Sequence, residues 1–317
     1  MEHAARPVVL VLTGPTATGK TAAAVQLCRL AGGEVVTADS MQVYRGMDIG
    51  TAKPTAAERG GVAHHLIDLA GPDETFSVSR YVQAGIPCVD ALLARGVLPV
   101  IAGGTGLYID ALLAGRAFAA CPGDGALRQA LSDEYDAVGG AAFRERLRAV
   151  DPERAERLAP ADKKRLVRAM EVFRLTGRTI TEHDRETALL PPRYPALKFA
   201  LTFEDRDTLY RRIDLRAARM VEDGLFDEVQ ALLDRGVTPD CTAMQGIGYK
   251  EAAEALLGRC TRQQALEQIQ LASRRYAKRQ LTWLRRDADV RWLAMDHRTP
   301  AQAAQELLHA WQAAQAG

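Results

Sequence analysis

The feature that most constrains the fold is a glycine-rich loop near the N-terminus, Gly14-Pro15-Thr16-Ala17-Thr18-Gly19-Lys20-Thr21. It fits the pattern G-x-x-x-x-G-K-[ST], in which glycines let successive backbone N–H groups turn toward one anion. An apolar run at 8–12 precedes the loop and favours a buried strand, and residues 21–30 favour a helix. Because a helix N-terminus attracts anions, this order predicts a P-loop that binds a pyrophosphate or polyphosphate.

Two side chains of the loop have distinct expected roles, while all eight residues are assigned to phosphate binding. Lys20 supplies a point charge to the phosphates, and the Thr21 hydroxyl is a candidate Mg²⁺ ligand. A chance glycine-rich turn is the alternative, and the strand–loop–helix order argues against it. The motif leaves open which molecule carries the phosphates.

Composition excludes several classes of protein. The 317 residues include 41 basic and 40 acidic side chains, so the net charge of +1 predicts no nucleic-acid partner unless charges cluster locally. Hydrophobic residues make up 47% and allow a sizeable core. No apolar stretch is long enough for a signal peptide or a membrane span, so we expect no membrane contact. The five cysteines, Cys28, Cys88, Cys121, Cys241 and Cys260, are too widely spaced for a zinc site and predict free thiols in the cytoplasm.

Three predicted strands end in polar loops. The strand at 8–12 ends in the phosphate-binding loop, the one at 34–38 ends in Asp39-Ser40-Met41-Gln42, and the one at 98–102 ends in Gly103–Tyr108. Helical patterns lie between them, notably at 79–95. The alternation predicts a parallel sheet with helices on both faces. Ligands bind at the carboxyl ends of such strands, so the three loops are expected to face one site.

The texture changes from about residue 116. Residues 126–177 are almost entirely helix-forming, a proline-rich break follows at 190–195, and a strand pattern returns at 198–203. These patterns predict a P-loop α/β core formed by 1–116 and 197–317, with an all-helical insertion at 117–196. The remainder is predicted to be helical at 207–235, 248–257 and 262–286.

The polar loops contain candidates for catalysis. Asp39 follows a strand beside the phosphate-binding loop and suits either Mg²⁺ binding through water or general-base catalysis, with a turn or helix-cap role as the alternative. Gln42 offers a donor and an acceptor that suit reading a base edge. The glycines of Gly103–Gly106 indicate either a strained turn or close approach to a ligand.

Basic residues gather in three places. Lys163, Lys164 and Arg165 open a predicted helix, with a solvated helix face as the alternative. Residues 273–286 hold six basic side chains and no acidic one, which favours a polyanion such as RNA; within them, Tyr276 suits base stacking or the core, and we expect Trp283 in the core. Arg212 and Arg216 share a helix face and suit a departing phosphate, with surface pairing to Glu222 and Asp223 as the alternative.

Taken together, these segments resemble the bacterial tRNA dimethylallyltransferases, also called isopentenyl-diphosphate:tRNA transferases. The match runs along the whole chain in the expected order and is jointly specific. Its segments are GPTATGKT (14–21), DSMQVY (39–44), DIGTAKP (48–54), GGTGLY (103–108), D-x-x-R-x-x-R-A-x-E (162–171), QGIGYKE (245–251) and SRRYAKRQLTW (273–283).

The resemblance implies transfer of a dimethylallyl group from dimethylallyl diphosphate to N6 of adenosine 37 of tRNA, with Mg²⁺ as cofactor, in a monomer. Asp39, Lys20 and Thr21 are the implied catalytic residues. A P-loop kinase acting on a small acceptor, and an RNA-binding protein without catalysis, are the alternatives. The implied tRNA contacts are Asp39, Ser40, Met41, Gln42, Thr105, Arg128, Lys163, Lys164, Arg165, Leu166, Val167, Gln245, Gly246, Ile247, Gly248, Tyr249, Lys250, Arg274 and Lys278.

Overall fold

The chain divides into two compact units in a computed structural model that describes residues 8–115, 124–188 and 190–316. The sheet unit comprises Met1–Gly115 and Arg193–Gly317, and the helical unit comprises Arg116–Pro192. Each unit has its own hydrophobic core. The predicted start of the insertion at 117, and Cys121 with its expected free thiol, lie outside the described residues.

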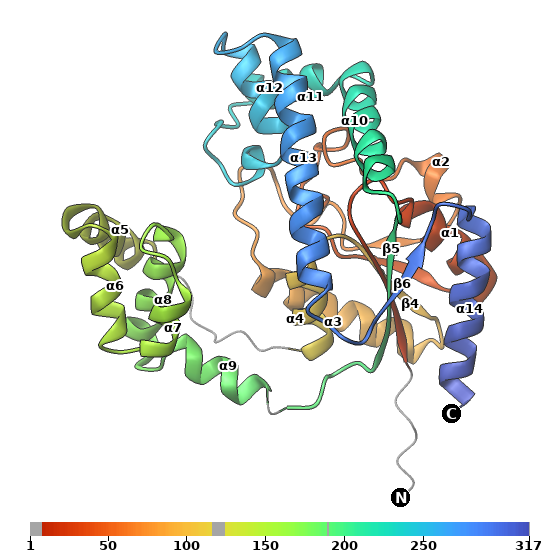
Figure 1. Ribbon diagram of the computed structural model, residues 1–317, viewed down its shortest axis with the longest axis horizontal. Helices are drawn as coiled ribbons and strands as arrows, with labels where there is room; N and C mark the ends of the chain where they lie inside the picture. Colours follow the sequence, from red (N-terminus) through yellow and green to blue (C-terminus); the bar gives the residue numbers. More distant parts are fainter. Residues whose placement is uncertain (1–7, 116–123, 189, 317) are drawn as a thin grey trace, which may run out of the picture. The chain divides into compact units, whose positions relative to one another are not determined.

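The sheet has six strands, all parallel, in the order β3-β2-β4-β1-β5-β6 (Figure 1). This confirms the predicted parallel sheet flanked by helices. The sequence patterns missed β3, which has two residues, and β6, which follows a charged segment. The strand bounds are β1 Val9–Thr13, β2 Glu34–Thr37, β3 His64–His65, β4 Pro99–Ala102, β5 Ala196–Thr202 and β6 Val290–Ala294.

The helices of the sheet unit connect these strands and extend beyond them. One prediction was wrong: residues 207–235 form two helices, because Gly224 (φ +104°) breaks the chain between them. The bounds are α1 Lys20–Ala31, α2 Ala56–Arg59, α3 Val78–Ala94, α4 Gly106–Ala114, α10 Arg206–Glu222, α11 Leu225–Asp234, α12 Tyr249–Leu256, α13 Arg262–Leu284 and α14 Pro300–Ala316, with a short 3₁₀ turn at Ala243–Gln245.

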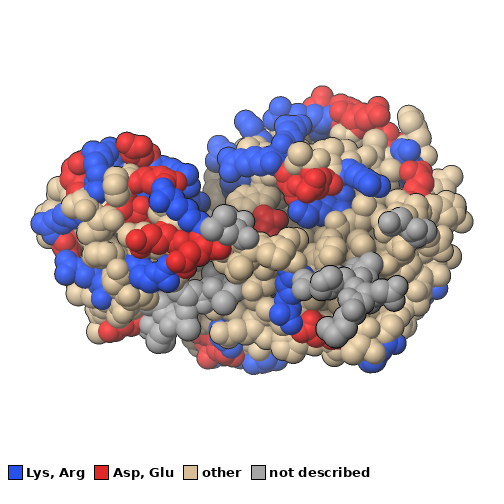
Figure 2. Space-filling view, turned by 90° about the horizontal axis from the view of Figure 1, so that it is seen from below, with Lys and Arg blue, Asp and Glu red and all other residues tan. Residues whose placement is uncertain are grey.

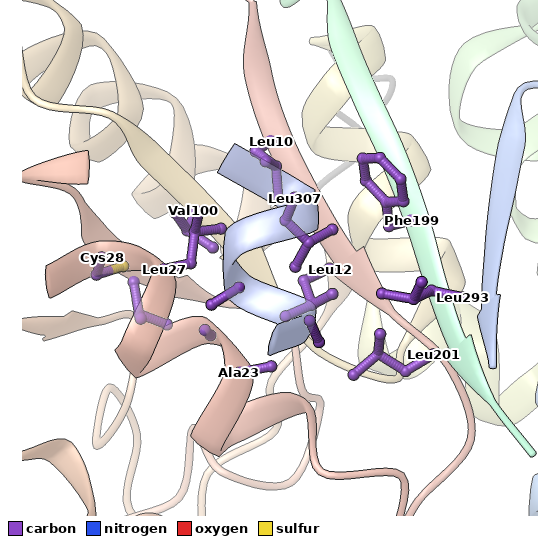
Figure 3. Close-up of a cluster of buried hydrophobic side chains, with 14 of the residues drawn as sticks. Leu10, Leu12, Ala23, Leu27, Cys28, Val100, Phe199, Leu201, Leu293 and Leu307 are labelled. Atoms are coloured by element: carbon purple, nitrogen blue, oxygen red, sulfur yellow. The ribbon is translucent and has the colours of Figure 1, made fainter. Parts of the chain in front are cut away.

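The main core lies under one face of the central strands. Leu10 and Leu12 of β1 alternate toward this face and pack with Leu27 of α1 and Leu307 of α14 (Figure 3). These residues are at most 1% exposed, which anchors the strand immediately before the phosphate-binding loop. Burial at this density holds the loop on a rigid base.

The described part of the helical unit, residues 124–188 and 190–192, has five helices around a smaller core. Leu131, Phe143, Leu147 and Leu166 are buried at its centre. Acidic and basic side chains are interspersed on its visible surface (Figure 2). The helices are α5 Gly125–Val138, α6 Gly140–Arg148, α7 Pro152–Arg157, α8 Lys163–Thr176 and α9 Ile180–Ala188.

Helix length and hydropathy also bear on membrane contact. Across residues 8–115, 124–188 and 190–316, no helix combines the length and apolar character needed to cross a bilayer.

Candidate active site

The backbone of the glycine-rich loop at 14–21 needs glycine at two positions. Gly14 has φ +132°, and a Cβ there would lie 2.3 Å from the Leu201 carbonyl oxygen of β5. Gly19, at φ +87°, turns the chain into α1. The buried Thr18 hydroxyl donates to the Pro15 carbonyl at 2.9 Å and closes the loop on itself. The loop is therefore a preformed turn at a helix N-terminus, the geometry suited to an anion.

Lys20 brings to this loop an amine whose protonated form is disfavoured. Its Nζ donates to the Pro15 carbonyl at 2.6 Å. Burial and, to a smaller extent, the nearby Arg216 guanidinium lower the pKa of Lys20 to about 7, and the Asp39 carboxylate opposes both effects. The two basic groups and the carboxylate thus interact electrostatically, and a bound anion would reduce the repulsion between Lys20 and Arg216.

Both candidate arginines of α10 lie near the loop. Arg212 Nε donates to the Ala17 carbonyl at 3.0 Å, and its guanidinium lies 5.1 Å from the Phe203 ring centroid. Arg216 is half-buried, and burial lowers its pKa, against the attraction of Asp39 and Glu58. For Arg212 these contacts replace the alternative of surface pairing with Glu222 or Asp223. The two arginines are placed to contact phosphates bound at the loop.

The low pKa of Lys20 predicts a pH-dependent affinity for pyrophosphate. A bound anion favours the charged amine and raises its pKa, so binding near pH 7 takes up a proton. Affinity is then full below pH 7 and falls as pH rises above it, by up to about tenfold per unit.

Isothermal titration calorimetry with inorganic pyrophosphate in buffers of different ionisation enthalpy measures this proton uptake. Lys20→Arg is the matched control, because a guanidinium stays charged over the range and cancels the titration of the ligand itself. Equal pH profiles for wild type and Lys20→Arg would contradict the prediction.

Asp39 occupies a turn and the site at the same time. Its Oδ1 accepts the backbone N–H groups of Met41 at 2.9 Å and Gln42 at 3.4 Å, so the turn role is confirmed. Its negative charge raises the pKa values of both Lys20 and Arg216, so the three groups interact electrostatically. The turn orients the carboxylate, which stays half-buried and accessible for chemistry.

The residues that follow Asp39 make hydrogen bonds to other parts of the protein. The Ser40 N–H donates to Thr105 Oγ1 at 3.0 Å. Gln42 Nε2 donates to the Thr51 and Ala52 carbonyls, both at 3.2 Å. The predicted reading of a base edge by Gln42 therefore needs revision, since its donor group is engaged and its carbonyl oxygen remains for a partner.

A buried lysine and a glutamate, both missed by the sequence reasoning, fix the chain that follows. Lys53 Nζ donates to the Tyr44 carbonyl at 2.8 Å, to Asp48 at 2.5 Å and to Asp68 at 2.6 Å. Glu228 of α11 accepts from the Asp48, Ile49 and Gly50 N–H groups and from the Tyr249 hydroxyl. The Asp-Ile-Gly-Thr-Ala-Lys segment contained the signal for Lys53, and nothing local pointed to Glu228.

Some implied tRNA contacts have buried side chains. Tyr249 is 1% exposed and bound to Glu228, so its predicted tRNA contact is corrected to a structural role for its side chain. Gln245 donates to the Pro239 carbonyl at 2.8 Å, and Gly248 N–H donates to Glu251. Lys250 is exposed. Gly246 and Ile247 are half-buried.

The loop Gly103–Gly106 owes its glycines to protein neighbours. None of its three glycines has a positive φ, so the strained-turn expectation was wrong. A Cβ on Gly103 would lie 2.1 Å from the Ala38 carbonyl oxygen, and one on Gly104 would lie 2.3 Å from Gln280 Nε2. A Cβ on Gly106 would lie 2.5 Å from the Trp283 ring. The close approach is to the Asp39 strand and to α13.

Helix α13 lies against both loops. Gln280 is 7% exposed, accepts the Thr16 N–H at 3.2 Å and donates to the Gly104 carbonyl at 2.9 Å. Burial and the nearby Asp39 carboxylate raise the pKa of Tyr276 to about 12, against the opposing effect of the Thr105 and Gln280 side chains. The core placement of Trp283 was wrong: it is 41% exposed and donates to Asp110 at 3.1 Å. Packing on a glycine lets this indole stay at the surface.

The basic stripe of α13 is partly compensated within the protein. Arg274 contacts both carboxylate oxygens of Asp214 at 2.6 and 2.7 Å, so its predicted tRNA contact competes with an ion pair. Lys278 remains exposed. Four further arginines of the stretch 273–286 are exposed as well: Arg275, Arg279, Arg285 and Arg286.

The basic patch of the helical unit is mostly ion-paired. Lys163 pairs with Asp136 and Arg165 with Asp162, while Arg128 pairs with the buried Glu171. Lys164 is exposed. Leu166 and Val167 are 0% and 5% exposed, so their implied tRNA contacts are corrected to core packing of the side chains.

The donor set at the loop fits Mg²⁺ bound together with phosphates. In the part of the chain that the structure describes, no group of three or more His, Cys, Asp or Glu side chains forms a dedicated metal cage. Mg²⁺ commonly takes only one or two protein ligands and completes its shell with substrate phosphates and water. The exposed Thr21 hydroxyl at the start of α1 is suited to that arrangement.

Comparison with known proteins gives consistent matches. The IPP transferase family model matches residues 42–287, and the isopentenyl transferase model matches residues 7–72. The chain is 48% identical over 288 residues to the tRNA dimethylallyltransferase of Desulfosudis oleivorans, covering 91% of each chain. It is 44% identical over 300 residues to that of Pelotomaculum thermopropionicum, covering 94% of this chain and 95% of the relative.

Solved structures agree with the sequence matches. The tRNA isopentenylpyrophosphate transferase of Bacillus halodurans is 40% identical with a TM-score of 0.72, and the match covers 98% of this chain and 97% of that one. A eukaryotic dimethylallyltransferase described as acting on tRNA is 25% identical with a TM-score of 0.81. That match covers 95% of this chain and 77% of the eukaryotic one.

Proposed function

The chain belongs to the IPP transferase family of tRNA dimethylallyltransferases, and we propose that it transfers a dimethylallyl group from dimethylallyl diphosphate to N6 of adenosine 37 of tRNA. The observation that carries this proposal is that Lys20 and Arg212 donate to carbonyls of the phosphate-binding loop, while Lys20 and Arg216 interact electrostatically with Asp39. Two cations suit a pyrophosphate leaving group, and a carboxylate suits the proton of an amine.

The reaction forms one bond and breaks one. The N6 nitrogen attacks C1 of the donor, the C1–O bond breaks, and pyrophosphate leaves with the bonding electrons. The adenine amine is a weak nucleophile because its lone pair is delocalised into the ring, and Asp39 is the residue placed to accept its proton. Lys20, Arg212, Arg216 and the loop N–H groups stabilise the charge that develops on the leaving group.

Mg²⁺, held by Thr21 and the pyrophosphate, would neutralise further negative charge on the leaving group. The target base is stacked in free RNA, so it must be extruded to reach Asp39. The exposed basic side chains of α13 are suited to hold phosphates of the tRNA while this happens.

The kinase alternative is not favoured. The relatives that match more than nine-tenths of this chain are named tRNA dimethylallyltransferases. Incubation with unmodified tRNA and dimethylallyl diphosphate, followed by nucleoside mass analysis, tests the proposal. Prenylated adenosine supports it; ATP consumption without such a product would favour a kinase.

Lys278→Ala is expected to weaken tRNA binding without changing donor binding. If the exposed amine neutralises one phosphate, its loss makes the log–log salt dependence shallower by about 0.7–0.9, because fewer counterions are released. Binding titrations at several salt concentrations measure the slope. Arg274→Ala is a poorer probe, since it also removes the ion pair with Asp214. An unchanged slope for Lys278→Ala would assign this residue to a solvated face.

Lys164→Ala gives the corresponding test for the helical unit. Lys164 is exposed, whereas its neighbour Arg165 is paired with Asp162. A shallower salt slope supports a tRNA contact by this unit, and an unchanged slope argues against one at this residue.

A cytoplasmic location suits a tRNA substrate and the four free cysteines among the described residues. The monomeric state stays a prediction, which sedimentation measures.

A further inference from the structure

One buried glutamine joins the phosphate-binding loop to the Gly103–Gly106 loop. Gln280 accepts the Thr16 N–H at 3.2 Å with Oε1 and donates to the Gly104 carbonyl at 2.9 Å with Nε2. Gln280 is 7% exposed. Burying an amide costs free energy unless both of its ends are paired, and here each end is bound to a different loop.

The connection continues to the Asp39 loop. The Tyr276 hydroxyl lies one helical turn before Gln280, close enough for the side chains of Thr105 and Gln280 to lower its pKa. Thr105 Oγ1 in turn accepts the Ser40 N–H at 3.0 Å. Polar contacts therefore run from Thr16 in the phosphate-binding loop through Gln280, Tyr276 and Thr105 to Ser40, the residue beside Asp39.

Close packing makes this connection specific. The space beside Gly104 is filled by Gln280, since a Cβ there would lie 2.3 Å from Nε2. Helix α13, which carries both Tyr276 and Gln280, lies against α4 at the end of the Gly103–Gly106 loop (Figure 1). An apolar side chain could fill this space, but it could not hold the Thr16 N–H.

We propose that Gln280 is a positioning residue, which fixes the phosphate-binding loop relative to the Asp39 loop and so sets the distance between the leaving group and the base. The inference rests on the proposed function for its catalytic consequence. Reacting groups must be aligned within fractions of an ångström, and a displacement of about 1 Å can cost ~10²-fold in rate. Gln280 acts through the Thr16 backbone, and we assign it no contact with substrate.

Two variants separate positioning from simple packing. Gln280→Leu keeps the volume and removes both hydrogen bonds. Gln280→Glu keeps an acceptor for the Thr16 N–H, but when ionised it faces the Gly104 carbonyl without a proton to donate. When protonated, the introduced carboxyl can accept from Thr16 and donate to Gly104, as the amide does.

The expected signature is a pH profile. Gln280→Leu lowers kcat by ~10–100-fold at all pH values relative to wild type, with tRNA affinity unchanged. The rate of Gln280→Glu relative to wild type rises as pH falls, because burial raises the pKa of the introduced carboxyl and its neutral form restores both bonds. Gln270→Leu is the matched control, since Gln270 is also on α13 and donates to the Asp214 carbonyl away from both loops.

A second readout does not depend on catalysis. Amide hydrogen exchange at Thr16, followed by NMR on ¹⁵N-threonine-labelled protein, is expected to accelerate in Gln280→Leu and to stay slow in Gln270→Leu. Wild-type protein without prenylated product would refute the proposed function, while the Thr16 exchange would still test the positioning. Wild-type kcat and unchanged exchange in Gln280→Leu would overturn the inference. If that variant fails to fold, a flat relative pH profile for Gln280→Glu would overturn it.

Discussion

The Lys20→Ala variant is expected to lose nearly all transfer, by on the order of 10³-fold in kcat/KM for the donor. In the free protein, Lys20 is held beside Arg216 in a buried setting that lowers its pKa to about 7. That arrangement is unfavourable without an anion and becomes favourable when pyrophosphate binds. Because the charge on the leaving group grows as the C1–O bond breaks, the transition state loses more than the ground state when the amine is removed.

Single-turnover rates with prenylated tRNA as the readout measure this loss. Lys20→Arg is the companion variant, which keeps a charge while changing its shape and reach. It should retain pyrophosphate binding and lose part of the rate. Near wild-type turnover of Lys20→Ala would move the donor site away from the phosphate-binding loop.

The sheet and its loops could be predicted because their signals are local. The apolar run 8–12 and the glycines at 14 and 19 encode a strand and a turn within a dozen residues, and the structure has both. The position of Asp39 at the end of β2 also followed from order along the chain. Parallel strands bring their carboxyl ends together, so convergence of the loops was implied by topology.

The residues that join those loops could not be predicted in the same way. Gln280 contacts Thr16 across 264 positions of sequence, and Glu228 contacts the Asp48 N–H across 180. Helical periodicity places a residue on a face, but it does not say which loop covers that face. Trp283 illustrates the limit, because a large aromatic was expected in the core and instead packs at the surface on Gly106.

Family resemblance carried its own error. The segment around Lys163–Val167 matches as a block, although its members do different things in the structure. Leu166 and Val167 are core residues, and Lys163 and Arg165 have acidic partners, which leaves Lys164 as the cation of this described run that is exposed and makes no ion pair. A matching motif identifies the family, whereas burial and pairing decide which of its side chains can reach a ligand.

Asp39→Asn is expected to lower the chemical rate by roughly 10²–10⁴-fold, the usual contribution of a positioned base. Asparagine is the sharpest probe because its side-chain oxygen can still accept the Met41 N–H that Asp39 now binds at 2.9 Å, so the turn is kept and only the basic charge is lost. Asp39→Ala removes the turn as well, and the difference between the two variants measures the structural part.

The two roles left open for Asp39 predict different binding. If Asp39 is the base, both variants bind tRNA and dimethylallyl diphosphate with near wild-type affinity, and only the single-turnover rate falls. If it mainly holds Mg²⁺, donor affinity falls together with the rate, and raising Mg²⁺ partly restores both. Removing the carboxylate also takes away a negative charge that raises the pKa of Lys20, so the amine would lose its proton at lower pH. Rates and donor affinities of Asp39→Asn should therefore be compared with wild type over a range of pH below 7, and a wild-type rate at the low-pH plateau would exclude both roles.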